Sequence, residues 1–520
     1  MNDNKHQERV LKNASSQMVS SLVQSLLGFI SRKVFLISLG ADLLGLNSLM
    51  TSILGMLSIA ELGVGEAINF SLYEPLAKND TKQVSSIMRL YKKLYLCIAA
   101  VIGALGGILF FFLPKLVDNT VPIDMVYKTF ALFLLDSCLS YCLAYKRNII
   151  SADQQDYIVI NIDTIAQILL SIGQIVLLLL TKNFYIYLII KIVTTLARNW
   201  YIFQLANKKY PYLISSEQPD PLPKEYLANL TYNVKALFVT RVSYFCVSGT
   251  DNMLLSSFVS LASVAIYNNY ITILSLFNRT VNTVFEKARS IIGNYIILNG
   301  KEQSYPLFKR IFFINFILTS YTSIGIFVVT NSVISLWMGP DQIWSLPIVG
   351  LLVFNNYSRY ILQTCEVFRG AMGLYSPRPI IKYAALFEGI LNLAASIALI
   401  MILENNILGV FLGTSISTVV STICVPWINY KFIFNRPLRE FFALYCKYLA
   451  IGLIALIMSQ LVFSLLYTQS HFINIIIGIV VCSIVTGGIY LVTFFRTDEF
   501  RYLISIANRL LLKKLKKRDK

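Results

Sequence analysis

Charged side chains are scarce in this sequence of 520 residues. They make up 14% of the chain and hydrophobic residues 56%, whereas an ordinary soluble domain is about 25% charged. The longest polar stretch covers roughly residues 206–224, which is too short for a soluble domain of useful size. The composition therefore excludes a cytosolic globular enzyme and predicts a membrane protein.

The groups that usually carry catalysis are scarce too. There are two histidines, His6 and His471, and eight cysteines without a CxxC pair, all within or beside apolar segments. A metal site is therefore not expected, and the cysteines are interpreted as small buried side chains. The chain also has no GxxxxGK[ST] loop, no GxSxG motif and no paired carboxylates in a soluble loop. We expect neither an enzyme nor a bound cofactor.

Long apolar runs are what the sequence has in abundance. A membrane-spanning helix needs roughly 20 mostly apolar residues, and fourteen segments qualify. They lie near 15–39, 44–72, 93–113, 124–147, 157–181, 184–205, 232–258, 263–285, 307–331, 345–370, 380–403, 406–430, 442–467 and 472–495. The predicted fold is all-α and polytopic, with about fourteen transmembrane helices.

The 45 Lys and Arg residues outnumber the 27 Asp and Glu residues, and they gather in the polar N-terminal tail and in every second gap between apolar runs. The positive-inside rule then predicts that both termini are cytoplasmic. This topology accounts for the basic surplus, so nucleic acid is not an expected partner. The basic amphipathic tail from 496 to 520 is predicted to lie on anionic membrane lipids.

An internal repeat relates the two halves of the chain. The hairpin that starts at Glu61, with Pro75 predicted to end its first helix, is echoed in part about 222 residues later. The segment from Asp163 is similarly echoed from Glu388. Six helices intervene, which describes a parallel repeat. The predicted domains are an N-lobe (1–205), a cytoplasmic linker (206–231), a C-lobe (232–430), two added helices (431–495) and the tail (496–520).

Polar residues recur every three or four positions along several predicted helices, which places them on one face. A charge in the bilayer centre is costly unless it faces a partner or a wet cavity. We therefore predict a central cavity between the lobes. The expected cations of the cavity are Arg32, Arg241, Arg279 and Arg359, and its expected polar residues are Glu61, Asp251, Asn252, Gln24 and Asn268.

Each candidate has a structural alternative. The arginines could be interfacial side chains that extend to water or pair locally, and the Ser, Thr and Asn residues could join helices to one another. Lys191, Arg198 and the pair Lys146 and Arg147 are interpreted as positive-inside anchors, with a deeper role left open for Lys191.

Four stretches carry a resemblance to a known family. They are ELGVGEAINFSLYEPLAKND from Glu61, SIMRLYKKLY from Ser86, TDNMLLSSF from Thr250 and AIYNNY from Ala265. At these residues the chain resembles bacterial polysaccharide (O-antigen-type) flippases of the multidrug/oligosaccharidyl-lipid/polysaccharide exporter superfamily. The predicted helix number, repeat and orientation agree with that family.

The resemblance implies two lobes that open alternately to either side of the bacterial cytoplasmic membrane and translocate an undecaprenyl-diphosphate-linked oligosaccharide. The four arginines would then bind the diphosphate, and the polar residues of the cavity, Glu61 and Asp251 among them, would pair with these arginines or accept a coupling ion. Polysaccharide polymerases or glycosyltransferases would then be further partners, and the last two helices would flank the lipid tail. The alternatives are a cation-coupled multidrug antiporter of the same architecture, a lipid II flippase and an integral-membrane sugar polymerase. The polymerase is disfavoured because no large extramembrane loop is expected.

The polar face of the first helix generates a prediction. Arg32→Ala should reduce export and leave membrane insertion intact, because a diphosphate would lose a charge-assisted contact. Export assays and membrane fractionation measure the two effects. Wild-type export by this variant would assign Arg32 to the interfacial class.

Overall fold

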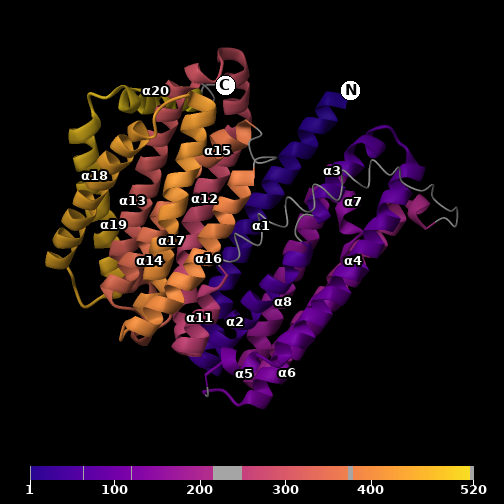
Figure 1. The fold of residues 1–520 in the computed structure, drawn as a ribbon. Coiled ribbons are helices and arrows are strands. Elements are labelled where there is room, and N and C mark those ends of the chain that lie inside the picture. The colour runs from indigo at the N-terminus through magenta and orange to yellow at the C-terminus, as the bar shows by residue number, and fades with distance from the viewer. Residues whose placement is uncertain (1, 62–63, 119, 215–248, 373–378, 516–520) are drawn as a thin grey trace. The chain divides into compact units, whose positions relative to one another are not determined.

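The computed structural model describes the chain except for residues 1, 62–63, 119, 215–248, 373–378 and 516–520. All regular elements of the described residues are helices, and none is a strand (Figure 1). The chain forms two compact units, residues 1–265 and 266–520, which are described separately.

Among its described residues, the first unit contains nine α-helices before residues 215–248 and one complete α-helix after them. They are α1 (Asn2–Leu39), α2 (Ala41–Leu57), α3 (Val64–Ala77), α4 (Thr81–Phe110), α5 (Leu113–Leu116), α6 (Ile123–Ala144), α7 (Arg147–Ala152), α8 (Asp156–Thr181), α9 (Phe184–Lys209) and α11 (Asp251–Phe258). Two 3-10 turns, η1 (Ser58–Glu61) and η2 (Pro211–Leu213), accompany them.

Helix α12 (Leu261–Asn299) begins in the first unit and continues into the second. The other helices of the second unit are α13 (Tyr305–Trp337), α14 (Leu346–Tyr360), α15 (Gln363–Ala371), α16 (Pro379–Ile402), α17 (Asn406–Asn429), α18 (Arg439–Leu465), α19 (His471–Phe494) and α20 (Asp498–Leu515). Short turns lie at η3 (Glu302–Ser304) and η4 (Pro340–Gln342), and a π turn at η5 (Tyr430–Phe434) extends α17.

Ten helices in the described residues are long and apolar enough to cross a membrane, and α2 is a shorter apolar helix. The all-α polytopic fold predicted from the sequence is confirmed. The predicted seventh span and most of the predicted linker lie outside the described residues, so the lobe boundaries stay a prediction.

Two helix N-caps have the spacing of the internal repeat that the sequence predicts. Asn183 caps α9, and Asn405 caps α17, which is 222 positions later.

The single helix predicted over 44–72 is wrong, because two helices replace it. Helix α2 ends at Leu57 and passes into η1, and α3 then begins at Val64. Polar side chains mark this break: the Ser58 hydroxyl donates to the carbonyl of Leu54 at 2.8 Å, and the Glu61 carboxylate receives donors from neighbouring helices. The polar side chains at this interruption therefore have hydrogen-bond partners within the fold.

The prediction that Pro75 ends the first helix of this hairpin is also wrong. Helix α3 continues through Pro75 to Ala77. Proline removes one amide donor, but the carbonyl of Pro75 still accepts the amide of Asp80 at 2.9 Å, and that of Glu74 accepts the amide of Lys78 at 3.0 Å. The missing amide donor lies near the end of α3, where the chain turns.

The span predicted at 345–370 is broken as well, between α14 and α15. The side-chain amide of Asn315, on α13, donates to the carbonyls of Tyr360 and Ile361 at 3.0 and 2.8 Å. Asn315 thereby provides hydrogen-bond donors to the carbonyls at the break, where the hydrocarbon of a bilayer has none to offer.

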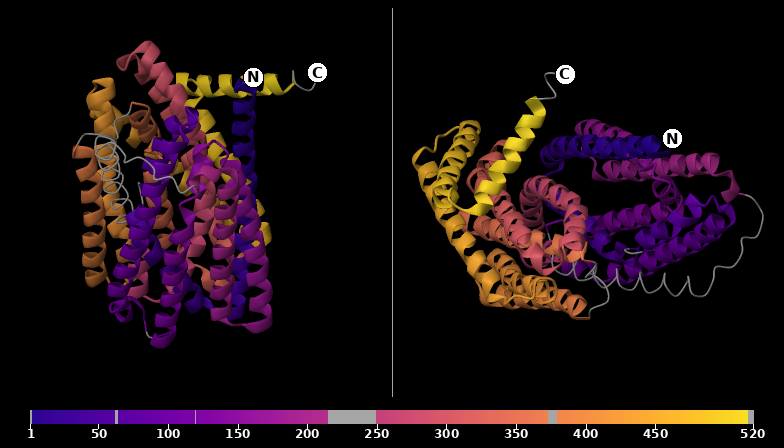
Figure 2. Two further views of the ribbon diagram at one scale, coloured as in Figure 1. Left: turned by 90° about the vertical axis from the view of Figure 1, so that its right-hand side faces the viewer. Right: turned by 90° about the horizontal axis from the view of Figure 1, so that it is seen from above.

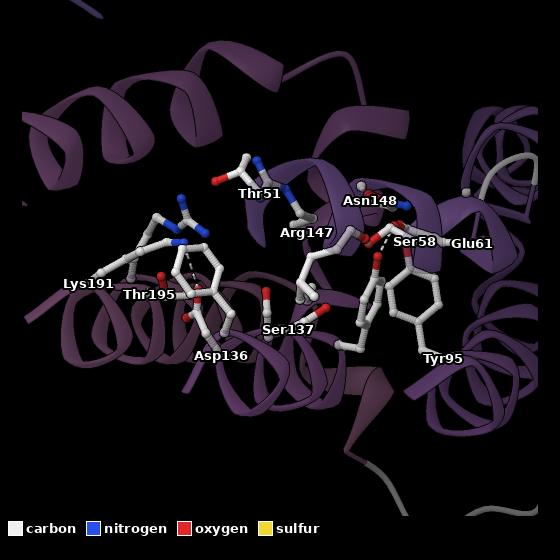
Figure 3. Close-up of a pocket in the computed structure, with 18 of the residues that line it drawn as sticks. Thr51, Ser58, Glu61, Tyr95, Asp136, Ser137, Arg147, Asn148, Lys191 and Thr195 are labelled. Carbon is white, nitrogen blue, oxygen red and sulfur yellow. Dashed lines mark hydrogen bonds and ion pairs between the residues drawn. The ribbon is translucent and has the colours of Figure 1, made fainter. Parts of the chain in front are cut away.

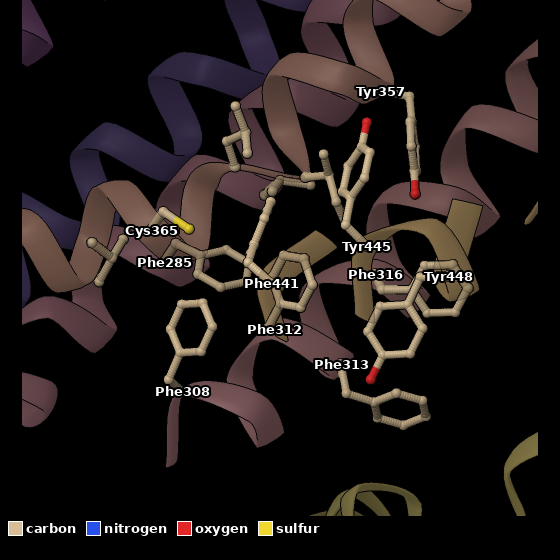
Figure 4. Packing of buried hydrophobic residues seen from close by; sticks show 14 of the residues in the cluster. Phe285, Phe308, Phe312, Phe313, Phe316, Tyr357, Cys365, Phe441, Tyr445 and Tyr448 are labelled. Carbon is tan, nitrogen blue, oxygen red and sulfur yellow. The ribbon is translucent and has the colours of Figure 1, made fainter. Parts of the chain in front are cut away.

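Aromatic side chains form the core of the second unit (Figure 4). Phe308, Phe312 and Phe316 recur every fourth residue on one face of α13 and are buried. Tyr448 of α18 stacks on Phe316 with ring centroids 4.5 Å apart, and Phe494 of α19 meets Phe316 edge-on at 5.9 Å. The two C-terminal spans are thus held to α13 by interlocking rings.

Helix α20 lies crosswise to the long spans of its unit (Figure 2). The Lys309 ammonium on α13 lies 3.7 Å from the Glu499 carboxylate, and the Arg310 guanidinium lies 4.9 Å from the centre of the Tyr502 ring. Helix α20 is therefore attached to the end of α13.

Helices α16 and α17 approach each other very closely. A Cβ added to Gly413 would lie 2.5 Å from the Ser396 Cα, and one added to Gly409 would lie 2.8 Å from the Ile400 nitrogen. Asn392 donates to the hydroxyls of Thr414 and Ser417, both at 3.1 Å. Small residues spaced by four and a polar pair are a common way to join helices in membranes.

This packing generates a stability prediction. Gly413→Ala should destabilise the protein by about 1–3 kcal/mol, because the added methyl group meets backbone that cannot move aside. Thermal unfolding of the purified protein in detergent measures the effect. Gly487→Ala is the matched control, because nothing lies within 4 Å of the Cβ it would add. Equal melting temperatures for the two variants would contradict the prediction.

Candidate functional site

A polar cavity of about 730 Å³ lies inside the first unit (Figure 3). Its walls come from α2, η1, α3, α4, α6, α7, α8 and α9. Five charged side chains line it: Glu61, Asp136, Arg147, Lys191 and Arg198. Ser58, Ser137, Ser140 and Thr195 add hydroxyl groups. A cavity of this composition between apolar spans holds water or a polar ligand.

Two arginines share one carboxylate at this cavity. Nη2 of Arg147, at the start of α7, lies 2.5 Å from Oδ2 of Asp163 on α8. Nε of Arg198, on α9, lies 3.6 Å from the other oxygen, Oδ1. That distance allows an ion pair but is too long for a hydrogen bond. The Arg198 Nε is buried and makes no hydrogen bond with the described residues.

A second ion pair lies across α6 and α9. The Lys191 ammonium lies 3.6 Å from Oδ2 of Asp136 and 4.1 Å from the centre of the Phe133 ring. Both side chains come from the middle of apolar spans, so each provides the counter-charge that the other needs. Lys191 and Arg198 are seven residues apart on α9, which places them on the same face.

Glu61 has neutral donors instead of a cation. Tyr95 of α4 donates to its Oε1 at 2.5 Å, and Tyr141 of α6 donates to its Oε2 at 2.7 Å. Within the described residues, no Lys or Arg lies at ion-pairing distance from this carboxylate. Both oxygens of this carboxylate therefore have hydrogen-bond partners within the fold.

The other predicted site residues of the first unit lie elsewhere. Arg32 of α1 donates from Nη2 to the Ala265 carbonyl at 3.0 Å. Gln24 is exposed and donates to Ser20 at 3.0 Å. Asp251 and Asn252 are buried on α11, where Asn252 donates to the Ser52 hydroxyl at 2.6 Å. Glu61 lines the cavity and these four residues do not.

Three predicted residues belong to the second unit. Arg279 is exposed on α12, and Arg359 is half-buried at the end of α14. Asn268 is half-buried, and its backbone carbonyl accepts the Thr272 hydroxyl at 2.6 Å. Arg241 lies outside the described residues. The binding roles assigned to these residues stay predictions.

The sequence analysis missed the cations of the cavity. Arg147, Lys191 and Arg198 were interpreted as positive-inside anchors, with a deeper role left open for Lys191, and all three line the cavity. A signal for them was present: Lys191 and Arg198 are separated by seven residues in one apolar run, and Asp136 and Asp163 interrupt two others. Opposite charges inside neighbouring spans indicate pairing within the membrane.

This arrangement suits an anion with several oxygens better than a metal. Guanidinium groups form paired hydrogen bonds with phosphate or carboxylate, and Arg198 has a donor unused by the described residues. Among the described residues, no group of three or more His, Cys, Asp or Glu side chains is placed to hold a metal ion.

The sequence matches no protein-family model and no curated protein. Solved structures do match its fold. The chain is similar to a structure titled lipid II flippase MurJ, inward closed conformation, with a TM-score of 0.63, 15% identity and coverage of 91% of this chain and 98% of that one.

Transporters of the MATE class are similar as well. An inward-facing multidrug resistance MATE transporter of the MOP superfamily matches with a TM-score of 0.61, 13% identity and coverage of 78% of this chain and 93% of the other. A MATE structure in the bent conformation matches at 0.53, with 12% identity, 81% of this chain and 94% of the other. The chain therefore has the polytopic fold that the MurJ flippase and MATE transporters share.

Proposed function

We propose that this protein is a flippase that translocates an undecaprenyl-diphosphate-linked oligosaccharide across the bacterial cytoplasmic membrane by alternating access. The observation that carries the proposal is the shared carboxylate of Asp163, which serves both Arg147 and Arg198. Two guanidinium groups on one carboxylate leave one positive charge in excess. A diphosphate provides the negative charge and the acceptor oxygens that this group lacks.

The geometry suggests how the headgroup binds. Arg198 is held at 3.6 Å, without a hydrogen bond from its Nε, whereas Arg147 is held tightly at 2.5 Å. A phosphate oxygen would therefore engage Arg198 first, with Arg147 and Asp163 keeping its guanidinium in place. The hydroxyl groups of Ser137, Ser140 and Thr195 would contact the neighbouring sugar.

The cargo class rests on chemistry and on the fold. One structural neighbour is titled a lipid II flippase, and lipid II is another lipid-linked saccharide. We propose that Arg32, Arg241, Arg279 and Arg359 make further contacts with the diphosphate along its path, and that the last two spans, α18 and α19, flank its lipid tail. Both termini would be cytoplasmic, and polysaccharide polymerases or glycosyltransferases would act on the same lipid-linked glycan.

A cation-coupled multidrug antiporter is the second candidate, favoured by the carboxylates of Glu61 and Asp136 in the cavity. A cationic drug would bind these carboxylates. The three lining cations oppose this reading, because Lys191 already neutralises Asp136 at 3.6 Å. Competition between a labelled lipid diphosphate and a cationic dye for the purified protein separates the two candidates.

The variant Arg198→Ala tests directly whether Arg198 binds the lipid diphosphate. In proteoliposomes, the flipping rate of a labelled undecaprenyl-diphosphate oligosaccharide should fall about 10- to 100-fold, since a hydrogen bond to a charged group contributes about 1.5–3 kcal/mol. Arg198→Lys should recover part of the rate, because it keeps the charge and loses the planar fork. Accessibility of the label to a membrane-impermeant reagent measures flipping.

Lys128→Ala is the matched control for this test. Lys128 is an exposed base on α6 that pairs with Asp124 at 2.7 Å and does not line the cavity. Its removal should leave the rate unchanged. A wild-type rate in Arg198→Ala, or transport of cationic dye without any flipping of the lipid diphosphate, would overturn the proposal.

A further inference from the structure

A small cavity of about 160 Å³ lies in the second unit, between α13, α14 and α18. Its walls are mostly apolar and include Ile324, Val353 and Leu456. An apolar cavity of about 150 Å³ in a protein core stays dry and binds benzene or xenon. This cavity therefore has room for a ligand about the size of one aromatic ring.

Two glycines contribute to this space. A Cβ added to Gly350 of α14 would lie 3.5 Å from Cε2 of Phe327, and one added to Gly452 of α18 would lie 3.8 Å from Cε2 of Phe316. These are ordinary van der Waals distances, so close packing does not require glycine at either position. The side chains that these two residues lack leave space between the helices.

A polar group on the cavity wall lacks a partner. The hydroxyl of Tyr357 is buried and makes no hydrogen bond with the described residues, and the whole residue is only 6% exposed. Figure 4 shows Tyr357 beside Tyr445, with the two hydroxyl groups directed to opposite sides. A buried donor without an acceptor is costly. A ligand with an acceptor atom would remove that cost.

Water is a poor occupant of this cavity. A buried water molecule makes about three hydrogen bonds, and the polar side chains on the described walls are Tyr357, Ser320 and Ser323. Oγ of Ser320 already donates to the Phe316 carbonyl at 2.5 Å and accepts from the Tyr490 hydroxyl at 2.7 Å. A carbonyl oxygen, in contrast, needs only the one donor that Tyr357 offers.

Two of the lining residues reach the surface of the unit. Phe354 of α14 is 39% exposed and Leu453 of α18 is 44% exposed. Leu453 lies near the middle of α18, which is long and apolar enough to cross a membrane, and Ile454 and Ile457 of the same helix are exposed too. At that depth an exposed apolar face contacts hydrocarbon. A ligand of the cavity would therefore enter from the bilayer.

We propose that this cavity binds a lipophilic carbonyl compound of one-ring size that is dissolved in the bilayer. The ring lies between α13, α14 and α18, and the carbonyl oxygen accepts the hydroxyl hydrogen of Tyr357. This site differs from the lipid-tail role proposed for α18 and α19, because a polyprenyl chain is far too large for a cavity of about 160 Å³.

Such a ligand would act beside a helix break. Tyr357 lies in the last turn of α14, where its backbone carbonyl accepts the amide of Ile361 at 2.9 Å. Asn315 binds the carbonyls of Tyr360 and Ile361 at the same break. A bound ligand thus joins the end of α14 to α18. An effect of the ligand on flipping rests on the proposed function, but its binding at Tyr357 does not.

A fluorine NMR titration of the full-length protein in lipid nanodiscs tests the site without any cargo. The probes are para-fluoroacetophenone and para-fluoroethylbenzene, which are similar in size and differ in the carbonyl oxygen. Affinities are referred to the probe concentration in the lipid, which is measured with empty nanodiscs. The ketone should bind to a saturable site about 2- to 10-fold more tightly than the hydrocarbon, the effect of one neutral hydrogen bond.

Two variants separate the donor from the space. Tyr357→Phe keeps the ring and removes the donor, so the two probes should bind with equal affinity. Gly452→Leu should fill the cavity and abolish saturable binding of both probes, and leucine is a better helix former than glycine. Gly487→Leu is the matched control, because nothing lies within 4 Å of the Cβ it would add, and it should bind both probes as the wild type does.

Three results would overturn the inference: no saturable binding by the wild type, unchanged binding by Gly452→Leu, or a preference for the ketone that survives in Tyr357→Phe. The Tyr357→Phe comparison decides the matter even if Gly452→Leu does not fold. A failure of the flippase proposal is distinguishable, because it would appear as normal flipping by Arg198→Ala while the probe results stand.

Discussion

The pairing of charges inside hydrocarbon is the constraint on which the first unit depends. An isolated charge in a bilayer costs several kcal/mol, so every ionic side chain between the spans needs a partner on a neighbouring helix. Asp163 supplies one to Arg147 and Arg198, and Asp136 supplies one to Lys191. These contacts join α6, α7, α8 and α9 around a space that apolar packing would otherwise fill. These ion pairs therefore connect four of the helices that line the polar cavity.

The two units differ in the side chains that fill their interiors. The second unit has an aromatic core, in which Phe312 and Phe316 of α13 hold Tyr448 of α18. Its cavity between α13, α14 and α18 has a volume of about 160 Å³ and is mostly apolar. The first unit has the larger, charged cavity. Helices of similar composition therefore pack around aromatic rings and a small apolar cavity in one unit, and around a charged cavity in the other.

Most spans could be predicted from the sequence, because a run of about 20 apolar residues has few alternatives to a membrane helix. The broken helices could not. Asn315 binds carbonyls at the break after Tyr360, and phenols of α4 and α6 bind the Glu61 carboxylate beside the other break. Such partners lie far away in the sequence, so a hydropathy pattern does not reveal them.

The residues of the polar cavity could also be predicted only in part from the sequence. Glu61 was selected by its position on a polar helix face, and it lines the cavity. Arg147 and Arg198 were assigned to the rim because they follow or end apolar runs, as topology-determining bases do. Only the tertiary contact with Asp163 distinguishes a base that faces inward from one that faces the headgroups.

Helix α20 adds a consequence for the second unit in its membrane. It lies across the long spans and is tied to α13 through Lys309 with Glu499 and Arg310 with Tyr502 (Figure 2). Its basic amphipathic composition suits the headgroup layer. With α20 in the lipid layer that its sequence predicts, a tilt of α13 would move α20 through that layer or out of it, and lipid composition would add a resistance to tilting beyond the contacts among the spans.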